Sequence, residues 1–191
     1  LLAGLAALDE ALRRRGSGLI LRQGAPLDVL QQLREEAGAT AIFAEADFSP
    51  YARRRDRAVG QGLPLTLTGG VTVHPVEALH KADGTPYTVF TAFSRFWRSL
   101  PFPGAGLACP ERLPALPQVS TLALPSAPRL AEAALFPAGE VEARRRLERF
   151  CEQAIFDYAE GRNRLDLEGT SALSPYLRFG MISARQATWA A

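Results

Sequence analysis

Apolar segments of strand length alternate with amphipathic helical segments over the first hundred residues, and this alternation constrains the fold most strongly. Connections between alternating strands and helices this short are typical of βαβ crossovers, which place strands in a parallel sheet. The sequence therefore predicts an α/β domain over residues 1–100. Because the chain opens with a helix, we expect the first strand of this sheet to be missing before Leu1. The predicted strands are 18–22, 39–45, 63–69 and 71–73, and the predicted helices are 1–15, 26–37, 49–60 and 88–100.

A proline-rich stretch follows this domain. Eight of the fourteen prolines lie between Pro101 and Pro137, and the stretch has no hydrophobic period of 2 or 3.6. So long a segment without regular structure is uncommon inside a compact domain. We therefore interpret residues 101–137 as a linker between two domains.

Helical patterns return after the linker. Residues 139–161 predict one long amphipathic helix. Ser174 and Pro175 begin a short helix that Gly180 ends, and the segment 183–186 matches a capping box that begins another helix. Residues 138–191 therefore predict the beginning of an all-helical domain, which we expect to continue beyond Ala191.

Composition excludes several classes of protein. With 22 basic and 20 acidic residues, the net charge of +2 gives no polycationic surface for nucleic acid. Two cysteines cannot form a disulfide framework, so we expect a cytoplasmic protein. No apolar run approaches the roughly 20 residues that span a bilayer, so no membrane partner is expected. We also expect a monomer.

The segment 169–175, with the sequence GTSALSP, carries the densest set of polar groups. It combines three hydroxyls, a glycine and the start of a predicted helix within seven residues. Free backbone N–H groups at a helix start favour an anion such as a phosphate. The alternative is that Ser174 simply caps this helix, and spacing alone favours the cap.

Other features have structural explanations. Neither RGSG at 15–18 nor TGG at 68–70 forms a GxGxxG fingerprint, so a nicotinamide cofactor is not expected. His74 and His80 lack partners at ligand spacing, so no metal site is predicted. The basic cluster 51–57 is typical of a solvated helix face.

Aromatic and basic side chains near the predicted helices also have structural explanations. The aromatic stripe of the helix 88–100 is typical of a core. Tyr158 ends an apolar helix stripe, so its burial in a core needs no ligand, and Arg162 and Arg164 can cap the carbonyls of that helix.

Residues 158–186 nevertheless resemble the opening of the flavin domain of the DNA photolyase/cryptochrome family. That pattern has a tyrosine, an arginine four residues later, and Thr-Ser-x-Leu-Ser twelve residues after the tyrosine; Tyr158, Arg162 and Thr170 match this spacing. The segments 47–56 and 86–97 are similar to the family's antenna domain. The resemblance covers essentially the whole chain, and it implies a Rossmann-like antenna domain, a long linker and the start of a helical FAD-binding domain.

The resemblance implies a role for each matching residue. Arg162 would contact a DNA phosphate near a lesion. The implied activity is that of a deoxyribodipyrimidine photo-lyase: light-driven repair of cyclobutane pyrimidine dimers in damaged DNA, by electron transfer from reduced FAD. The dimer would be flipped out of the duplex for this step. The implied FAD contacts are Tyr158, Thr170, Ser171, Ala172, Leu173 and Ser174.

Parts of the family pattern lie outside this chain or differ from it. Catalytic residues, electron-relay tryptophans and most of the DNA surface would follow Ala191, so we expect the chain alone to bind FAD poorly and to lack repair activity. Folate-binding relatives carry Asn-Glu shortly before the Arg-Asp pair. Here Tyr51 and Ala52 occupy those positions before Arg55 and Asp56, which argues against folate and leaves a deazaflavin, another flavin or no second chromophore. A cryptochrome-type photoreceptor and a truncated non-catalytic remnant remain as alternatives.

Overall fold

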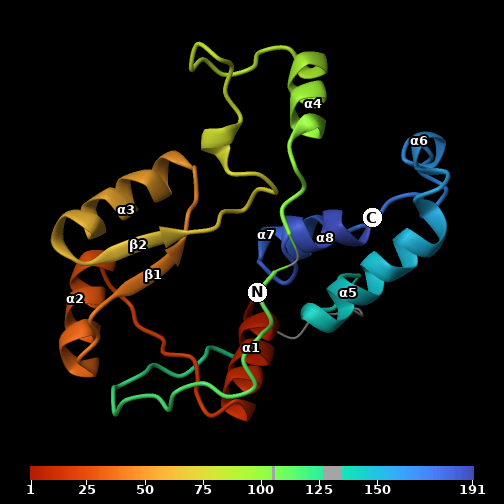
Figure 1. Ribbon diagram of the computed structural model, residues 1–191. Helices are drawn as coiled ribbons and strands as arrows, with labels where there is room; N and C mark the ends of the chain where they lie inside the picture. Colours follow the sequence, from red (N-terminus) through yellow and green to blue (C-terminus); the bar gives the residue numbers. More distant parts are fainter. Residues whose placement is uncertain (105, 127–134) are drawn as a thin grey trace.

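The computed structural model describes residues 1–104, 106–126 and 135–191, and the first of these ranges is an α/β unit (Figure 1). A 3-10 turn at Val76–Ala78 precedes the last helix of this unit. The prediction of an α/β domain with a parallel sheet is confirmed. Its helices and strands are α1 (Leu2–Arg14), α2 (Pro26–Ala37), β1 (Ile42–Glu45), α3 (Pro50–Gly62), β2 (Leu65–Thr68) and α4 (Phe90–Ser99).

Local signals set the ends of the first helices. Pro26 occupies the first turn of α2, and Gly38 ends that helix in the left-handed conformation with φ of 64°. The side chain of Ser49 accepts a hydrogen bond from the N–H of Ala52 at 3.3 Å and caps α3. These residues are adjacent in sequence to the helices they bound, so the pattern alone located both helices.

The sheet consists of two parallel strands connected by α3. The register pairs Ile42 with Leu65 and Glu45 with Thr68. Phe43, in the middle of β1, is 69% exposed. A two-stranded sheet buries little by itself, so its stability depends on the elements packed against it.

Two predicted strands are absent from the described structure. Residues 18–22 are extended, but the N–H of Leu19 donates to the Asp9 carboxylate at 2.8 Å and the N–H of Leu21 to the Thr121 hydroxyl at 2.8 Å. Residues 71–73 form bends. The strand predictions for both segments are therefore wrong, because a strand requires a neighbouring strand to pair with and the hydrophobic pattern does not supply one.

The described part of the predicted linker has no helix or strand. Residues 106–126 run back along the first unit, where the N–H of Leu113 donates to the carbonyl of Arg15 at 2.8 Å. Further along, the N–H of Leu122 donates to the carbonyl of Leu21 at 2.9 Å. The rest of the predicted linker falls partly on residues 127–134, outside the described residues.

The remaining chain is helical, with bounds that differ from the prediction. The single helix expected at 139–161 is wrong, because α5 (Glu140–Arg149) passes into a π-helical turn (Phe150–Ala154), and α6 (Tyr158–Gly161) is a separate short turn. The short helices α7 (Ser174–Arg178) and α8 (Ala184–Ala190) follow, and α8 begins with the predicted capping box of Ser183 and Gln186.

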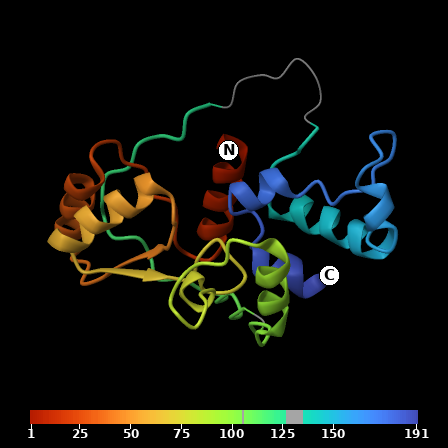
Figure 2. The same ribbon diagram turned by 90° about the horizontal axis from the view of Figure 1, so that it is seen from above.

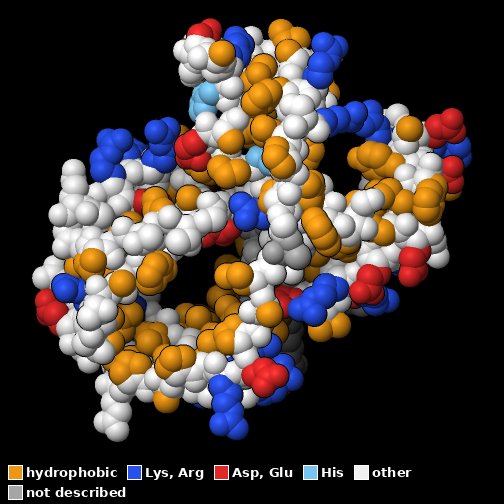
Figure 3. All heavy atoms as spheres, viewed as in Figure 1, with side chains coloured by type: hydrophobic (Ala, Val, Ile, Leu, Met, Phe, Trp, Pro, Cys, Tyr) orange, Lys and Arg blue, Asp and Glu red, His pale blue; other side chains and the backbone are white. Residues whose placement is uncertain are grey.

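A hydrophobic cluster joins α5, α7 and the turn before α8. Its buried members are Ala143, Leu147, Leu173, Tyr176 and Ile182, with Cys151, Met181 and Ala187 packed against them. In Figures 1 and 2, α2, α3 and the sheet lie on one side of the molecule and α5 and α6 on the opposite side. Figure 3 shows an opening bordered by hydrophobic side chains on the sheet side of the molecule.

Candidate functional site

Tyr158 begins the short helix α6, directly after the π-helical turn. The ring of Phe150 meets the ring of Tyr158 edge-on, with centroids 5.7 Å apart. The guanidinium of Arg162 lies over the same ring, 5.8 Å from its centroid. Tyr158 is 40% exposed, so the proposal that core burial explains it is wrong. The tyrosine ring is held between an aromatic ring and a cation, with part of it open to a ligand.

Two glycines bring this turn against the hydroxyl-bearing segment. A Cβ atom added to Gly169 would lie 2.5 Å from the carbonyl carbon and 2.9 Å from the Cα of Gly161. No side chain fits at such distances, so the backbones touch only because residue 169 is glycine. This contact brings Thr170, the residue after Gly169, toward the turn that begins at Tyr158, although twelve positions separate Tyr158 and Thr170 in the sequence.

The segment 170–174 presents polar groups that the described chain leaves without intramolecular partners. The hydroxyls of Thr170, Ser171 and Ser174 make no hydrogen bond to any other described residue. Ala172 has a φ of 49°, a conformation that non-glycine residues rarely adopt. Strained residues of this kind concentrate where a loop contacts a ligand.

The structure corrects two expectations about this segment. Leu173, not Ser174, is the N-cap of α7, and no side chain caps that helix, so the capping alternative for Ser174 is wrong. The helix has only five residues, so its dipole is small and the case for an anion here depends on hydroxyl and backbone N–H groups.

Buried side chains hold the segment 170–174 in place. Leu173 is 4% exposed and Tyr176 is 1% exposed, and both belong to the hydrophobic cluster. The Tyr176 hydroxyl donates to the carbonyl of Pro137 at 2.8 Å. The guanidinium of Arg146 lies over the Tyr176 ring, 5.5 Å from its centroid, so the base of the segment is rigid.

Ion pairs set the charge around this site. Arg145 and Arg146 donate to the Glu142 carboxylate at 2.8 Å, and these hydrogen bonds hold the pKa of Glu142 below its ordinary range. Arg164 binds Asp166 at 2.8 and 2.6 Å and lowers the pKa of that carboxyl. Arg164 therefore pairs with an acid instead of capping α6, which corrects that expectation.

A second hollow lies at the carboxyl ends of the two strands. It has a volume of about 770 Å³, and Asp47 and Gly69 border it just after β1 and β2. Open parallel sheets bind ligands outside the carboxyl ends of their strands. Its lining also includes Arg53 and Asp56 of α3 and His80 of the segment that follows β2.

One buried acid borders this hollow. Asp56 is 8% exposed and accepts a hydrogen bond from Arg55 at 2.7 Å, while its second carboxylate oxygen is buried without a partner in the described chain. The same hydrogen bond raises the pKa of Arg55. The prediction that 51–57 is only a solvated helix face is wrong for Asp56. Their position on the helix that follows a predicted strand is the sequence signal that could have pointed to a site.

Aromatic residues are less buried than predicted. The stripe on α4 is not a core, since no residue of α4 is fully buried and Phe90 is 77% exposed. Trp97 instead packs edge-on against buried His74, with centroids 4.8 Å apart. The ring centroids of Phe102 and Trp189 lie 5.6 Å apart, so Phe102 connects this cluster to α8.

The described residues contain neither a candidate metal site nor a helix that could span a membrane. Within ranges 1–104, 106–126 and 135–191, no group of three or more His, Cys, Asp or Glu side chains is placed to hold a metal ion. In the same ranges, no helix is long and apolar enough to cross a membrane.

Comparison with known proteins places this chain in one protein family. Residues 1–117 match the family model described as DNA photolyase. An uncharacterized 31.6 kDa protein of Synechococcus sp. is 37% identical over all of this chain and 70% of its own length. A deoxyribodipyrimidine photo-lyase of Thermus thermophilus is 36% identical, but the chain spans only 43% of that enzyme.

Solved structures agree with this assignment. A class III photolyase from Agrobacterium tumefaciens superposes with a TM-score of 0.82 at 29% identity, covering 99% of this chain and 42% of that protein. A Synechocystis cryptochrome superposes with a TM-score of 0.82 at 22% identity and supports the fold alone. The α/β unit, the helical start and the matched residues together show that the chain belongs to the DNA photolyase/cryptochrome family.

Proposed function

We propose that this chain forms part of a light-driven enzyme that repairs cyclobutane pyrimidine dimers in DNA. The observation that carries the proposal is the contact between Gly161 and Gly169, because it brings the Tyr158 turn beside the unpartnered hydroxyls of 170–174. The named photo-lyases at 34–36% identity support repair rather than signalling. Residues 138–191 would then contribute one side of a flavin site, 1–100 the antenna domain and 101–137 the linker.

The donor groups of the segment fit FAD. Three hydroxyls without intramolecular partners suit the oxygens of a diphosphate, and the half-exposed Tyr158 ring suits a planar or ribose-bearing ligand. In such an enzyme, FAD supplies light-driven electron transfer to the dimer, which splits the ring and returns the electron. Thr170, Ser171 and Ser174 would bind the phosphates, and buried Leu173 would hold the segment in place; Ala172 would contribute backbone contacts.

Arg162 lies at the boundary between the proposed flavin and DNA contacts. Its guanidinium is exposed and, within the described chain, has no carboxylate partner. Phosphate contacts from such a side chain position a protein on DNA and contribute to the salt dependence of binding. We propose that Arg162 contacts a phosphate near the lesion.

The hollow at the strand ends is proposed to hold a second chromophore. Its volume of about 770 Å³ lies within the range of small-molecule sites. The unpartnered oxygen of Asp56 and the exposed Arg53 would provide polar contacts. Tyr51 and Ala52 in place of Asn-Glu favour a deazaflavin or another flavin over folate.

Repair is tested with protein purified from its natural source and a thymine-dimer oligonucleotide, under blue light and in darkness. We expect dimers to disappear only in the light. Absence of repair by a protein that carries FAD would favour a cryptochrome-type photoreceptor. Absence of both FAD and repair would favour a non-catalytic remnant.

The proposed contacts are tested by replacing hydroxyls. Ser171→Ala combined with Thr170→Ala should lower the FAD content of the purified protein at least fivefold, since two charge-assisted hydrogen bonds would be lost. Thr66→Ala removes an exposed hydroxyl on β2 and should leave the FAD content unchanged. An unchanged FAD content in the double variant would remove the segment from the flavin site.

A further inference from the structure

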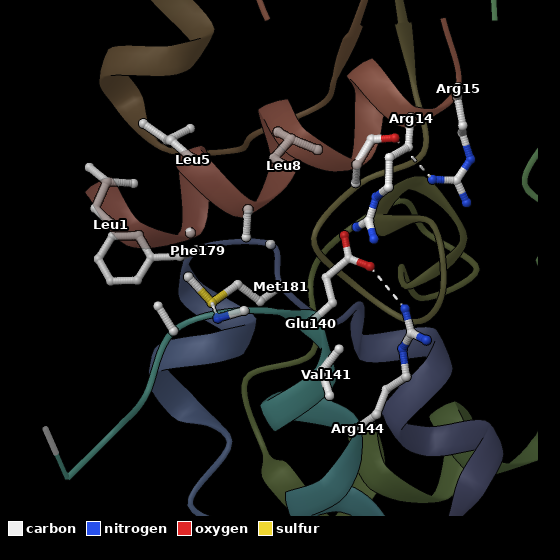
Figure 4. Close-up of a pocket in the computed structure, with 16 residues that line it drawn as sticks. Leu1, Leu5, Leu8, Arg14, Arg15, Glu140, Val141, Arg144, Phe179 and Met181 are labelled. Atoms are coloured by element: carbon white, nitrogen blue, oxygen red, sulfur yellow. Dashed lines mark hydrogen bonds and ion pairs between the residues drawn. The ribbon is translucent and has the colours of Figure 1, made fainter. Parts of the chain in front are cut away.

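A concave hollow separates α1 from the start of α5 and the turn before α8 (Figure 4). Its volume is about 420 Å³. We call it the α1–α5 hollow and define its apolar wall as Leu5, Leu8, Val141, Phe179 and Met181. Figure 4 shows Leu5 and Leu8 of α1 facing Phe179 and Met181 across the space. None of the residues 170–174 of the proposed flavin segment lines the hollow, although Phe179 follows Ser174 by only five positions.

The apolar wall is unusually exposed for large hydrophobic side chains. Leu8 is 39% exposed, Phe179 is 50% exposed and Val141 is 80% exposed. Single exposed hydrophobic residues are ordinary, but several that line one concave surface indicate a ligand or partner site.

Met181 holds the two sides of the hollow together. Its sulfur accepts a hydrogen bond from the N–H of Gly139 at 3.3 Å, which positions the start of α5. Its methyl group lies so close to Gly4 that a side chain at residue 4 would collide with it. The hollow is therefore preformed, and a ligand would not have to separate the two sides to enter it.

One end of the hollow carries excess positive charge. Arg144 pairs with Glu140 at 2.9 Å, and the guanidinium of Arg14 points toward the same carboxylate in Figure 4. Arg14 makes no ion pair within the described residues. Arg15 donates to the carbonyls of Pro110 and Ala11 and, among the described residues, to no carboxylate. Three cations against one anion favour an additional acidic group between Arg14 and Arg144.

We propose that the α1–α5 hollow binds a small amphiphilic anion. Its acidic group lies between Arg14 and Arg144, in competition with the Glu140 carboxylate. Its hydrocarbon part lies along the apolar wall, where burial of apolar surface supplies the affinity. This ligand site is separate from the proposed flavin and second-chromophore sites, because no residue of the apolar wall belongs to either.

Calorimetric titration of the full chain with dodecanoate tests the proposal, with dodecanol as the uncharged probe of matched length. We expect one saturable site for dodecanoate and at least fivefold weaker binding of dodecanol. Equal binding of the two probes, or no saturable binding of dodecanoate, would overturn the proposal. Dimerisation that dodecanoate does not displace, seen by size-exclusion chromatography, would assign the hollow to a second copy instead.

Paired variants separate the contribution of charge to dodecanoate binding from the contribution of apolar packing. Arg14→Gln should weaken dodecanoate binding about fivefold, whereas Glu140→Gln should strengthen it about twofold, because the competing carboxylate is removed. Val141→Ser should weaken both probes, and Arg54→Gln, an exposed arginine on α3, should change neither. Arg14, Glu140 and Val141 are exposed, so these variants keep the fold. Effects of the same sign from Arg14→Gln and Glu140→Gln would contradict the proposed position of the acidic group.

The FAD content of the same variants distinguishes this site from the proposed flavin site. We expect Arg14→Gln and Val141→Ser, introduced into the protein as it occurs in its natural source, to retain the FAD content of the unmodified protein. Loss of FAD together with dodecanoate binding would show that the hollow belongs to the flavin site and would overturn the assignment of a separate site.

Discussion

The helical region after Gly139 and the α/β region before Pro101 bury their hydrophobic residues to different extents. The helical region has a cluster of five buried side chains contributed by several segments. In the α/β region, the buried hydrophobic residues are Ala52, Val59 and Leu63, all on α3 or at its end, while α1, α2 and α4 have none.

This difference predicts unequal local stability. Regions with few buried apolar contacts open at lower free energy than regions with a shared core. The opening bordered by hydrophobic side chains in Figure 3 lies on the sheet side of the molecule, in agreement with this difference. The proposed flavin segment is fixed to the better-packed region, whereas the hollow at the strand ends belongs to the looser one.

The largest expected effect comes from removing the central aromatic residue of the helical cluster. Tyr176→Ala should lower the free energy of unfolding by about 4 kcal/mol, because it creates a cavity and leaves the Pro137 carbonyl without its donor. Phe43→Ala on β1, where the ring is 69% exposed, should cost less than about 1 kcal/mol. Urea denaturation measures both, and equal losses would contradict the proposed difference between the regions.

The second-largest expected effect tests whether water reaches the Asp56 carboxylate in the α/β region. Arg55→Ala leaves the Asp56 carboxylate buried without its cationic partner and should cost about 2 kcal/mol. Arg54→Ala on the same helix should cost less than about 0.5 kcal/mol, because Arg54 is exposed. A loss as small for Arg55→Ala as for Arg54→Ala would mean that water reaches Asp56 and that this region is still looser than proposed.

Alanine substitutions at two glycines, one in each region, should change the free energy of unfolding in opposite directions. Gly169→Ala should destabilise the protein by about 1–2 kcal/mol, because its Cβ would collide with the backbone of Gly161. It should also lower the FAD content by separating the Tyr158 turn from Thr170. Gly60→Ala on α3 meets no atom within 4 Å and should stabilise by about 0.5–1 kcal/mol. Thermal denaturation and FAD content together test this pair, and a destabilised Gly169→Ala variant with full FAD content would refute the role of the contact.

Acid should weaken the helical region through Glu142. Since Arg145 and Arg146 lower the pKa of Glu142 in the folded state, its ion pairs stabilise the protein at neutral pH and are lost as pH falls through this lowered pKa. Glu142→Gln should be less stable than the unmodified protein at neutral pH, and the difference should shrink as the pH falls below the ordinary range of a glutamate carboxyl. Melting temperatures across this range measure it, and a difference that does not vary with pH would exclude the ion pairs as its cause.

The smallest effect concerns Ala172. Its φ of 49° is unfavourable for alanine, so Ala172→Gly should stabilise the folded protein by about 0.5 kcal/mol after the entropy of glycine is counted. Ala184→Gly at the start of α8 should instead destabilise by about 0.5–1 kcal/mol. Stabilisation of Ala172→Gly with a reduced FAD content would show that the strained conformation serves ligand binding.

The sequence by itself determined the features that depend on neighbouring residues. Ser49 with Pro50, Pro26 with Gly38, and Ser183 with Gln186 locate the ends of three helices, since caps and turns involve residues within four positions of each other. The spacing of Tyr158, Arg162 and Thr170 indicated the family, which the comparisons confirm.

Only the tertiary structure decided the features that depend on distant partners. Residues 18–22 have the composition of a strand, but the described chain pairs them with Asp9 and Thr121 instead of a neighbouring strand. The contact of Gly161 with Gly169, and both hollows, join segments whose proximity no local pattern encodes. Strand pairing and concave sites require non-local contacts, whereas helix ends require only local hydrogen bonds, and this is why the helices were predicted better than the sheet or the sites.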